Sequence, residues 1–176
     1  MNREQQLVVL VVGVLSSVFF CRASQADVKQ VDRRNASEAT SYYLTFCARS
    51  GMPGHAFVVW GREDPTMGAC VMHAYGMWPA KNAIAIGEVP GRIVDEATTG
   101  SLAATTDRLI VRVNSDAFER AEAVRENWLG RDYELTSSVC VTFTAEVSQA
   151  IGLEVPQRWK ALLPQAFIRA LMRIND

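Results

Sequence analysis

The stretch SYYLTFCARSGMPGHAFVVWGREDPTMGACVMHAY, residues 41–75, decides the fold class. It contains three runs rich in aromatic and β-branched residues, which favour strands: 41–48, 55–60 and 69–75. The segments between these runs carry glycine and proline, the residues that mark turns. Three strands joined by two short turns predict a three-stranded antiparallel meander.

Helical spacing dominates the second half of the chain. A strand is expected over 108–113, and a helix that starts at Asn114 or Ser115 follows it to Leu129. Ser137 and Ser138 are positioned to cap a second helix, which ends at Gly152, and 159–174 forms a last amphipathic stretch. Residues 76–102 are expected to be irregular with one or two short strands. The expected fold class is therefore α+β, with a small antiparallel sheet packed against helices.

The first 26 residues resemble a secretory signal. Residues 7–20 (LVVLVVGVLSSVFF) form an apolar or small-residue run of about 14 residues, which is too short to cross a bilayer but typical of a signal peptide. Small residues before Asp27 indicate cleavage at that position. The expected organisation is a signal peptide over 1–26, a flexible lead-in over 27–40 and one domain over 41–176. A secreted or periplasmic protein follows, and an uncleaved anchor helix is the alternative.

The overall charge gives no sign of a polyanionic partner. The chain of 176 residues has 18 Lys and Arg against 19 Asp and Glu, for a net charge of −1, and 49% of its residues are hydrophobic. This composition is typical of a folded globular domain. Without a basic excess, neither nucleic acid nor an anionic membrane surface is an expected partner. Stable membrane insertion after signal cleavage is not expected either.

The cysteines bear on the redox state. Loss of 1–26 removes Cys21 and leaves Cys47, Cys70 and Cys140, an odd number. In an oxidising compartment this count suggests one disulfide and one free thiol. Cys47 and Cys70 fall on the first and third expected strands and form the candidate pair, although three reduced cysteines are the alternative. The His and Cys spacings are unlike those of zinc sites, and neither a metal nor a cofactor is expected.

Cys140 is the candidate nucleophile. It lies in the first turn of the second expected helix, where unpaired N–H groups and the helix dipole favour a thiolate. A thiolate can attack a carbonyl carbon, and the same N–H groups can bind the resulting oxyanion. The alternative role is that of a small apolar side chain packed against the core.

His55 is the candidate base, because it begins a strand next to a turn and an imidazole must assist a cysteine nucleophile. If the 61–68 turn pairs residues 60 and 69, His73 lies beside His55 on the next strand and can orient its ring. Glu63 and Asp64 are further candidates for this third position. The alternative for both histidines is a strand-surface position without a catalytic task.

Three short motifs resemble a known family. They are GHAFV at 54–58, AYGMWP at 74–79, and a Tyr-x-Leu…Cys-x-x-Phe pattern at 133–143. Together they are similar to the circularly permuted papain-like hydrolases, the NlpC-type and lecithin-retinol-acyltransferase-like group, in which histidine precedes cysteine. The resemblance covers about 41–155. It implies a permuted papain-like fold with Cys140 as nucleophile at a helix N-terminus, His55 as base, and a polar third residue on the following strand, here His73.

The resemblance implies an enzyme but leaves the substrate open, because the family includes peptidases, cell-wall amidases and acyltransferases. The leading hypothesis is an exported thiol hydrolase that cleaves an amide or peptide bond, in a peptide or peptidoglycan-like substrate, through an acyl-enzyme on Cys140. An acyltransferase or thioesterase with the same Cys-His dyad is one alternative. A secreted binding domain without activity is the other.

Overall fold

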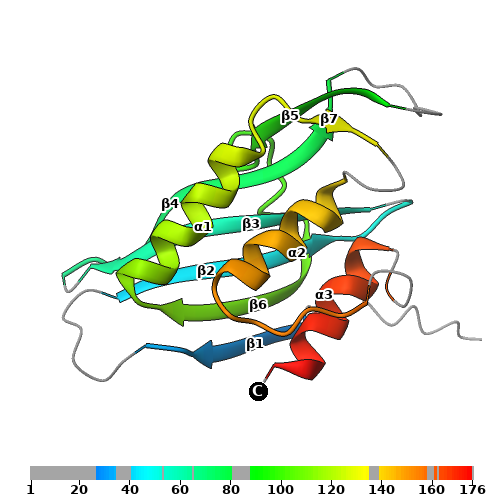
Figure 1. Cartoon of the computed structure of the whole chain (residues 1–176). Helices are drawn as coiled ribbons and strands as arrows, with labels where there is room; N and C mark the ends of the chain where they lie inside the picture. Colours follow the sequence, from blue (N-terminus) through cyan, green and yellow to red (C-terminus); the bar gives the residue numbers. More distant parts are fainter. Residues whose placement is uncertain are drawn as a thin grey trace, which may run out of the picture.

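The computed structural model describes residues 27–34, 41–52, 54–64, 66–80, 88–134, 139–157, 161 and 163–175. These residues form a seven-stranded mixed open sheet with three helices packed against one face, an α+β architecture (Figure 1). The strands lie in the order β1-β6-β2-β3-β4-β5-β7. The elements are β1 (Asp27–Asp32), β2 (Ser41–Arg49), β3 (His55–Asp64), β4 (Gly68–Pro79), β5 (Val89–Asp95), β6 (Thr105–Val113), α1 (Ser115–Asn127), β7 (Asp132–Tyr133), α2 (Cys140–Ala150) and α3 (Pro164–Ile174).

The expected antiparallel meander is confirmed as β2, β3 and β4 at the centre of the sheet. β3 is buried from His55 to Gly61, which agrees with its nearly continuous apolar sequence. The pairing of β2 with β3 is regular along its length and ends with Arg49 opposite His55. The strand expected over 108–113 and the helix expected to follow it as far as Leu129 are confirmed as β6 and α1.

The position of the β3–β4 turn differs from the sequence prediction. The segment 61–68 was expected to be a turn, but β3 continues to Asp64 and β4 begins at Gly68. The polar residues at the end of β3 pair with the first residues of β4. Polar side chains are accommodated there because this end of the two strands is exposed to solvent. As a result Trp60 faces His73, and the pairing that would place His73 beside His55 is wrong.

The expected lead-in is partly structured. Asp27–Asp32 forms β1, which pairs in parallel with β6 and makes the sheet mixed. Val31 is 8% exposed and joins the core, so one apolar residue and a ladder of backbone bonds order this short segment. Residues 1–26, the expected signal peptide, lie outside the described residues. No helix in the described part of the chain is long and apolar enough to span a bilayer.

The main core lies between the sheet and the three helices. Trp60 of β3 packs near Phe143 of α2, and Phe143 also meets Trp128 at the end of α1. α1 begins as predicted, because the Asn114 side chain accepts a hydrogen bond from the Ala117 N–H at 2.9 Å. α3 begins with Pro164, whose missing N–H costs nothing at that position.

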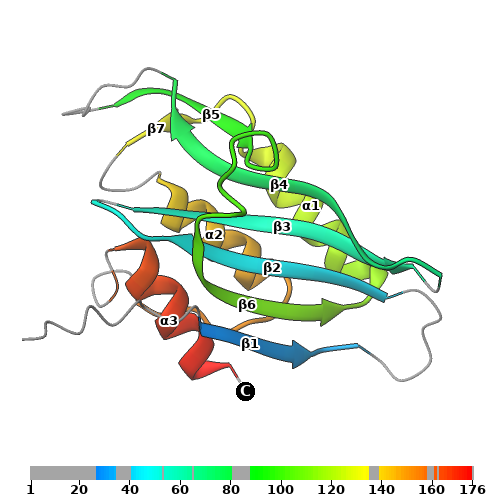
Figure 2. The same cartoon turned by 180° about the vertical axis from the view of Figure 1, so that it is seen from behind.

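Among the described residues, one segment, 96–104, crosses the opposite face of the sheet. It leaves β5, runs over the central strands and enters β6 (Figure 2). Leu102 of this segment packs on a second, smaller cluster of Cys47, Phe57, Val59 and Ala74. The segment therefore brings residues that follow β5 onto the outer face of β3, which carries His55.

The expected Cys47–Cys70 disulfide is absent, and both thiols are free. β3 separates the two strands, and Cys47 lies opposite Phe57 whereas Cys70 lies opposite Arg62. This stagger amounts to about 17 Å along the strands, with about 10 Å across them. A disulfide needs Cα atoms within about 7 Å. Burial raises the pKa of the Cys47 thiol to about 12.

The buried carboxylate of Asp107 ties β6 to α3, and its loss should weaken the fold. Asp107 is 0% exposed and accepts hydrogen bonds from Arg169 Nε and Gln165 Nε2, both at 2.8 Å. Asp107→Ala is expected to lower the free energy of unfolding by about 1–3 kcal/mol, measured by urea denaturation. Glu119→Ala, on the exposed face of α1, is the control. Equal effects of the two substitutions would contradict this role of Asp107.

Candidate active site

Cys140 is the first residue of α2, as the sequence predicted. The preceding residue, Val139, is extended and makes no side-chain cap, and Cys140 is 7% exposed. Ser137 and Ser138, the expected caps, lie outside the described residues. The N-terminus of α2 lies next to the start of β3 (Figure 1), where His55 is located.

The imidazole of His55 contacts two partners at this end of the sheet. Its Nε2 atom lies 2.7 Å from Glu96 Oε1. The ring also interacts with the Cys140 thiol, which is one of the groups that raise the pKa of His55. Because Nε2 is engaged by Glu96, Nδ1 is the nitrogen left for the thiol. The structure therefore brings together the two residues, His55 and Cys140, that the sequence singled out.

Glu96 completes this line of side chains. It is 0% exposed, directly follows β5, and begins the segment that crosses the outer face of the sheet. Its Oε1 accepts a second hydrogen bond from Trp78 Nε1 at 2.5 Å, and its Oε2 accepts one from Thr99 Oγ1 at 2.9 Å. Ser101 also donates to this carboxylate. Both carboxylate oxygens are therefore satisfied without water.

The charges of His55 and Glu96 support each other. Burial alone would lower the pKa of His55, but its hydrogen bonds to Cys140 and Glu96 outweigh burial and raise it. Burial alone would raise the pKa of Glu96, but bonds from His55, Ser101 and Trp78 lower it to about 2. The geometry thus favours an imidazolium held against a carboxylate near neutral pH.

Two residues of β4 shape the space around the imidazole. The Trp78 ring lies 4.2 Å from the His55 ring, at an interplanar angle of 35°. Gly76 supplies room: a Cβ there would lie within 3.0 Å of both His55 Nε2 and Glu96 Oε1. The motif AYGMWP therefore provides one donor to Glu96, one wall of the site and one position where a side chain cannot fit.

His73 lies elsewhere. It is opposite Trp60 on β4 and its ring stacks on Tyr75 at 5.5 Å, on the helix-facing side of the sheet. His55 instead shares the other face with Phe57 and Trp78. The position beside the His55 ring that was expected for His73 is occupied by Glu96.

Sequence reasoning missed Glu96. Its signal was weak: an acidic residue directly after a short apolar run, within the segment VDEATTGS at 94–101. The hydroxyl residues that follow are the donors that a buried carboxylate needs, and Thr99 and Ser101 serve in this way. Only the path of the chain across the sheet brings this segment to His55.

The arrangement can perform nucleophilic chemistry. A thiol beside an imidazole that is hydrogen-bonded in turn to a carboxylate is the arrangement of an activated nucleophile. The backbone N–H groups of Cys140 and Val141 open the first turn of α2, where an oxyanion can bind. In the described part of the chain, no cluster of His, Cys, Asp and Glu is arranged to hold a metal ion.

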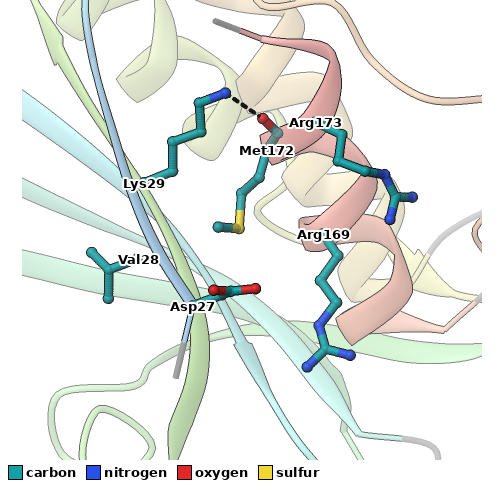
Figure 3. Close-up of a pocket in the computed structure, with 6 residues that line it drawn as sticks. All are labelled: Asp27, Val28, Lys29, Arg169, Met172 and Arg173. Carbon is teal, nitrogen blue, oxygen red and sulfur yellow. Dashed lines mark hydrogen bonds between the residues drawn. The ribbon is translucent and has the colours of Figure 1, made fainter. Parts of the chain in front are cut away.

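A hollow of about 420 Å³ lies at the other side of the molecule, between β1 and α3 (Figure 3). Its lining is Asp27, Val28, Lys29, Arg169, Met172 and Arg173. Lys29 Nζ donates to the Met172 carbonyl at 2.8 Å, and Arg169 binds the buried Asp107. These charges join β1 and β6 to α3, and the hollow contains none of the residues around Cys140.

Comparisons with protein-family models, with curated protein sequences and with solved structures found no match to this chain.

Gly76→Ala tests the close packing of the site. The new methyl group must displace either the His55 ring or the Glu96 carboxylate, because no room exists for it. Iodoacetamide should then alkylate Cys140 more slowly at neutral pH, as followed by mass spectrometry. Gly61→Ala is the control for glycine replacement in the sheet, because its Cβ would also be crowded, but by the Tyr43 ring and not by a residue of the site. An unchanged alkylation rate in Gly76→Ala would show that the space between Gly76, His55 and Glu96 can accommodate a methyl group.

Glu96→Gln should change stability in a pH-dependent way. The pKa of Glu96 falls from 4.5 to about 2, so its contribution is present above about pH 4.5 and is lost as the pH falls towards 2. The pKa of His55 rises from 6.5, so its contribution is present below that value and is lost as the pH rises through the raised one. The free-energy difference between wild type and Glu96→Gln should therefore be largest between about pH 4.5 and 6.5. Urea denaturation at several pH values measures it, and a constant difference would contradict the ion pair.

Proposed function

We propose that this protein is a cysteine-dependent hydrolase that cleaves an amide or peptide bond through an acyl-enzyme on Cys140. One observation carries the proposal: Cys140, the first residue of a helix, interacts with His55, whose ring is hydrogen-bonded to Glu96, and all three side chains are buried. Each member is at most 7% exposed. A buried ion pair of this kind is costly to assemble, and a nucleophile that needs a fixed base gives a reason for it.

The first half of the reaction uses the thiol and the imidazole. The thiolate sulfur bonds to the carbonyl carbon of the substrate, and the carbonyl π electrons move to the oxygen. The first-turn N–H groups of α2 stabilise that oxyanion. When the oxyanion collapses, the bond from carbon to the leaving nitrogen breaks, and His55 gives its proton to the departing amine. The acyl group stays on Cys140 as a thioester.

The second half releases the acyl group. Neutral His55 takes a proton from a water molecule, whose oxygen bonds to the thioester carbon. Collapse of this second intermediate breaks the bond to sulfur and frees a carboxylic acid. Another acceptor in place of water would give the acyltransferase alternative with the same residues.

Glu96 acts through His55 and is a positioning residue. Its contact with Nε2 fixes the ring so that Nδ1 points to the thiol, and its charge stabilises the imidazolium. Trp78 and Thr99 hold the carboxylate in turn, at 2.5 and 2.9 Å. The third residue is thus a carboxylate from the crossing segment, in place of the histidine expected on β4.

The proposal retains the permuted papain-like assignment. The chain order, with His55 before Cys140, agrees with that family, as does a cysteine that begins a helix packed on a sheet. Peptides or peptidoglycan-like amides remain the proposed substrates. Export also remains part of the proposal and rests on the apolar run at 7–20.

Alkylation of Cys140 against pH tests the proposal without a known substrate. In the wild type, iodoacetamide should alkylate Cys140 readily near neutral pH, because the imidazole of His55 can accept the thiol proton. His55→Ala should slow this alkylation, and Glu96→Gln should slow it by less. Peptide mass spectrometry after timed quenching reports Cys140 separately from the partly exposed Cys70.

Cys70 provides the internal comparison, because it has no imidazole partner in the described structure and should keep the same profile in every variant. Cys140→Ser is the blank for covalent labelling and should retain the wild-type fold. If Cys140 reacts like Cys70, and His55→Ala changes nothing, a folded domain without catalytic activity is the better description.

A further inference from the structure

Four side chains form a row across the outer face of the sheet at the end that contains the site. Arg49 of β2 is opposite His55 of β3, and Trp78 of β4 is opposite Arg92 of β5. The contact of the His55 and Trp78 rings, 4.2 Å between centroids, joins the two pairs. Cross-strand neighbours share a face, so the imidazole and the indole stand between two arginines.

Arg49 reaches directly to the site. Its guanidinium carbon lies 5.5 Å from the centre of the Trp78 ring, the ring that contacts His55. Its Nη1 atom makes only a long hydrogen bond of 3.4 Å to Ser101. No carboxylate among the described residues pairs with Arg49, so most of its five N–H donors stay available.

Arg92 stands on the other side of Trp78. It is exposed, and within the described ranges it makes neither an ion pair nor a side-chain hydrogen bond. Some other arginines of the described chain are held in ion pairs, namely Arg34 with Asp32, Arg112 with Glu63, Arg125 with Glu122, Arg131 with Glu146 and Arg169 with Asp107. Others, such as Arg120, bind a backbone carbonyl instead, so it is the place of Arg49 and Arg92 beside the site, and not their lack of a carboxylate alone, that matters. Within the part of the chain that the structure describes, Glu96 is the buried carboxylate next to the row, and it is already paired with His55.

We infer that the substrate carries an anionic group, a carboxylate or a phosphate, on its leaving part, and that Arg49 and Arg92 bind this group beside Trp78. The inference rests on the proposed acyl-enzyme at Cys140. We place the anion on the leaving part of the substrate because His55 gives its proton to the leaving group. The leaving group must therefore lie on the imidazole side of the thiol, where the two arginines are. Guanidinium groups bind planar and tetrahedral oxyanions through charge-assisted hydrogen bonds.

A pair of acetyl esters tests this inference. One has 4-nitrophenol as its leaving group, and the other has 5-hydroxy-2-nitrobenzoic acid, which adds a carboxylate to the same nitrophenol. In both, the thiolate sulfur bonds to the acetyl carbon, the ester C–O bond breaks and the phenolate leaves with the electron pair. Both therefore leave the same acetyl group on Cys140, and any difference arises before or at acylation. The measured quantity is the ratio of the two acylation rate constants, anionic over neutral.

Arg49→Met is expected to lower this ratio about tenfold, because it removes a charged donor and keeps an apolar chain against Trp78. Arg92→Met should lower it less, since the exposed Arg92 is screened by solvent and salt. Arg62→Met is the matched control: it lies on β3 near the far end from His55 and should leave the ratio unchanged. An equal ratio in wild type, Arg49→Met and Arg92→Met would overturn the inference.

Further esters separate the remaining possibilities. The acetyl ester of 4-hydroxyphenyl phosphate, compared with phenyl acetate, shows whether a phosphate is preferred to a carboxylate. Mono-4-nitrophenyl succinate places the carboxylate on the acyl part, and an Arg49-dependent preference for this ester alone would overturn the assignment to the leaving part. If no ester acetylates Cys140 of the wild type, the proposed function itself fails. If the esters acetylate Cys140 equally well, with or without the anionic group, only the inference about the anion fails.

Discussion

The fully buried carboxylate of Glu96 is the constraint on which the site depends. A carboxylate without water loses a large solvation free energy unless every lone pair finds a donor. His55, Trp78, Thr99 and Ser101 supply these donors from two strands and one crossing segment. Because Thr99 and Ser101 belong to the segment 96–104 and His55 and Trp78 to the sheet, their bonds to Glu96 hold this segment against the sheet.

The same carboxylate decides how the histidine is presented. An imidazole has two nitrogens, and a bond to Nε2 leaves Nδ1 for the thiol. His55 is the first residue of β3, so its ring lies at the sheet end, where α2 begins with Cys140 on the helix-covered side. The reactive pair therefore forms where two layers meet: the sheet supplies the base and its orientation, and the helix supplies the nucleophile and the N–H groups.

Local patterns predicted the elements, whereas long-range pairing placed the third residue. Strands β2, β3 and β6 and the helix cap at Asn114 follow from local residue types. The pairing of His55 with Cys140, which lie far apart in the chain, was expected from the family resemblance. The choice of His73 failed because the polar segment 61–68 resembles a turn but forms a hairpin, which places His73 on the opposite face. The Cys47–Cys70 pairing failed because β3 lies between the two strands. Glu96 depends on a crossing segment whose path has no local signature.

The charges around His55 connect the site to the arginines beside it. A guanidinium such as Arg49 disfavours a second positive charge on the neighbouring imidazole, and the Glu96 carboxylate offsets this repulsion. An anion bound by Arg49 and Arg92 would reduce this repulsion further. The leaving part of the substrate, which His55 must protonate, would then bring a negative charge that favours the protonated imidazole. Binding and proton donation would then be coupled through electrostatics alone. This coupling gives a physical reason for unpaired arginines beside a base that already has a carboxylate of its own.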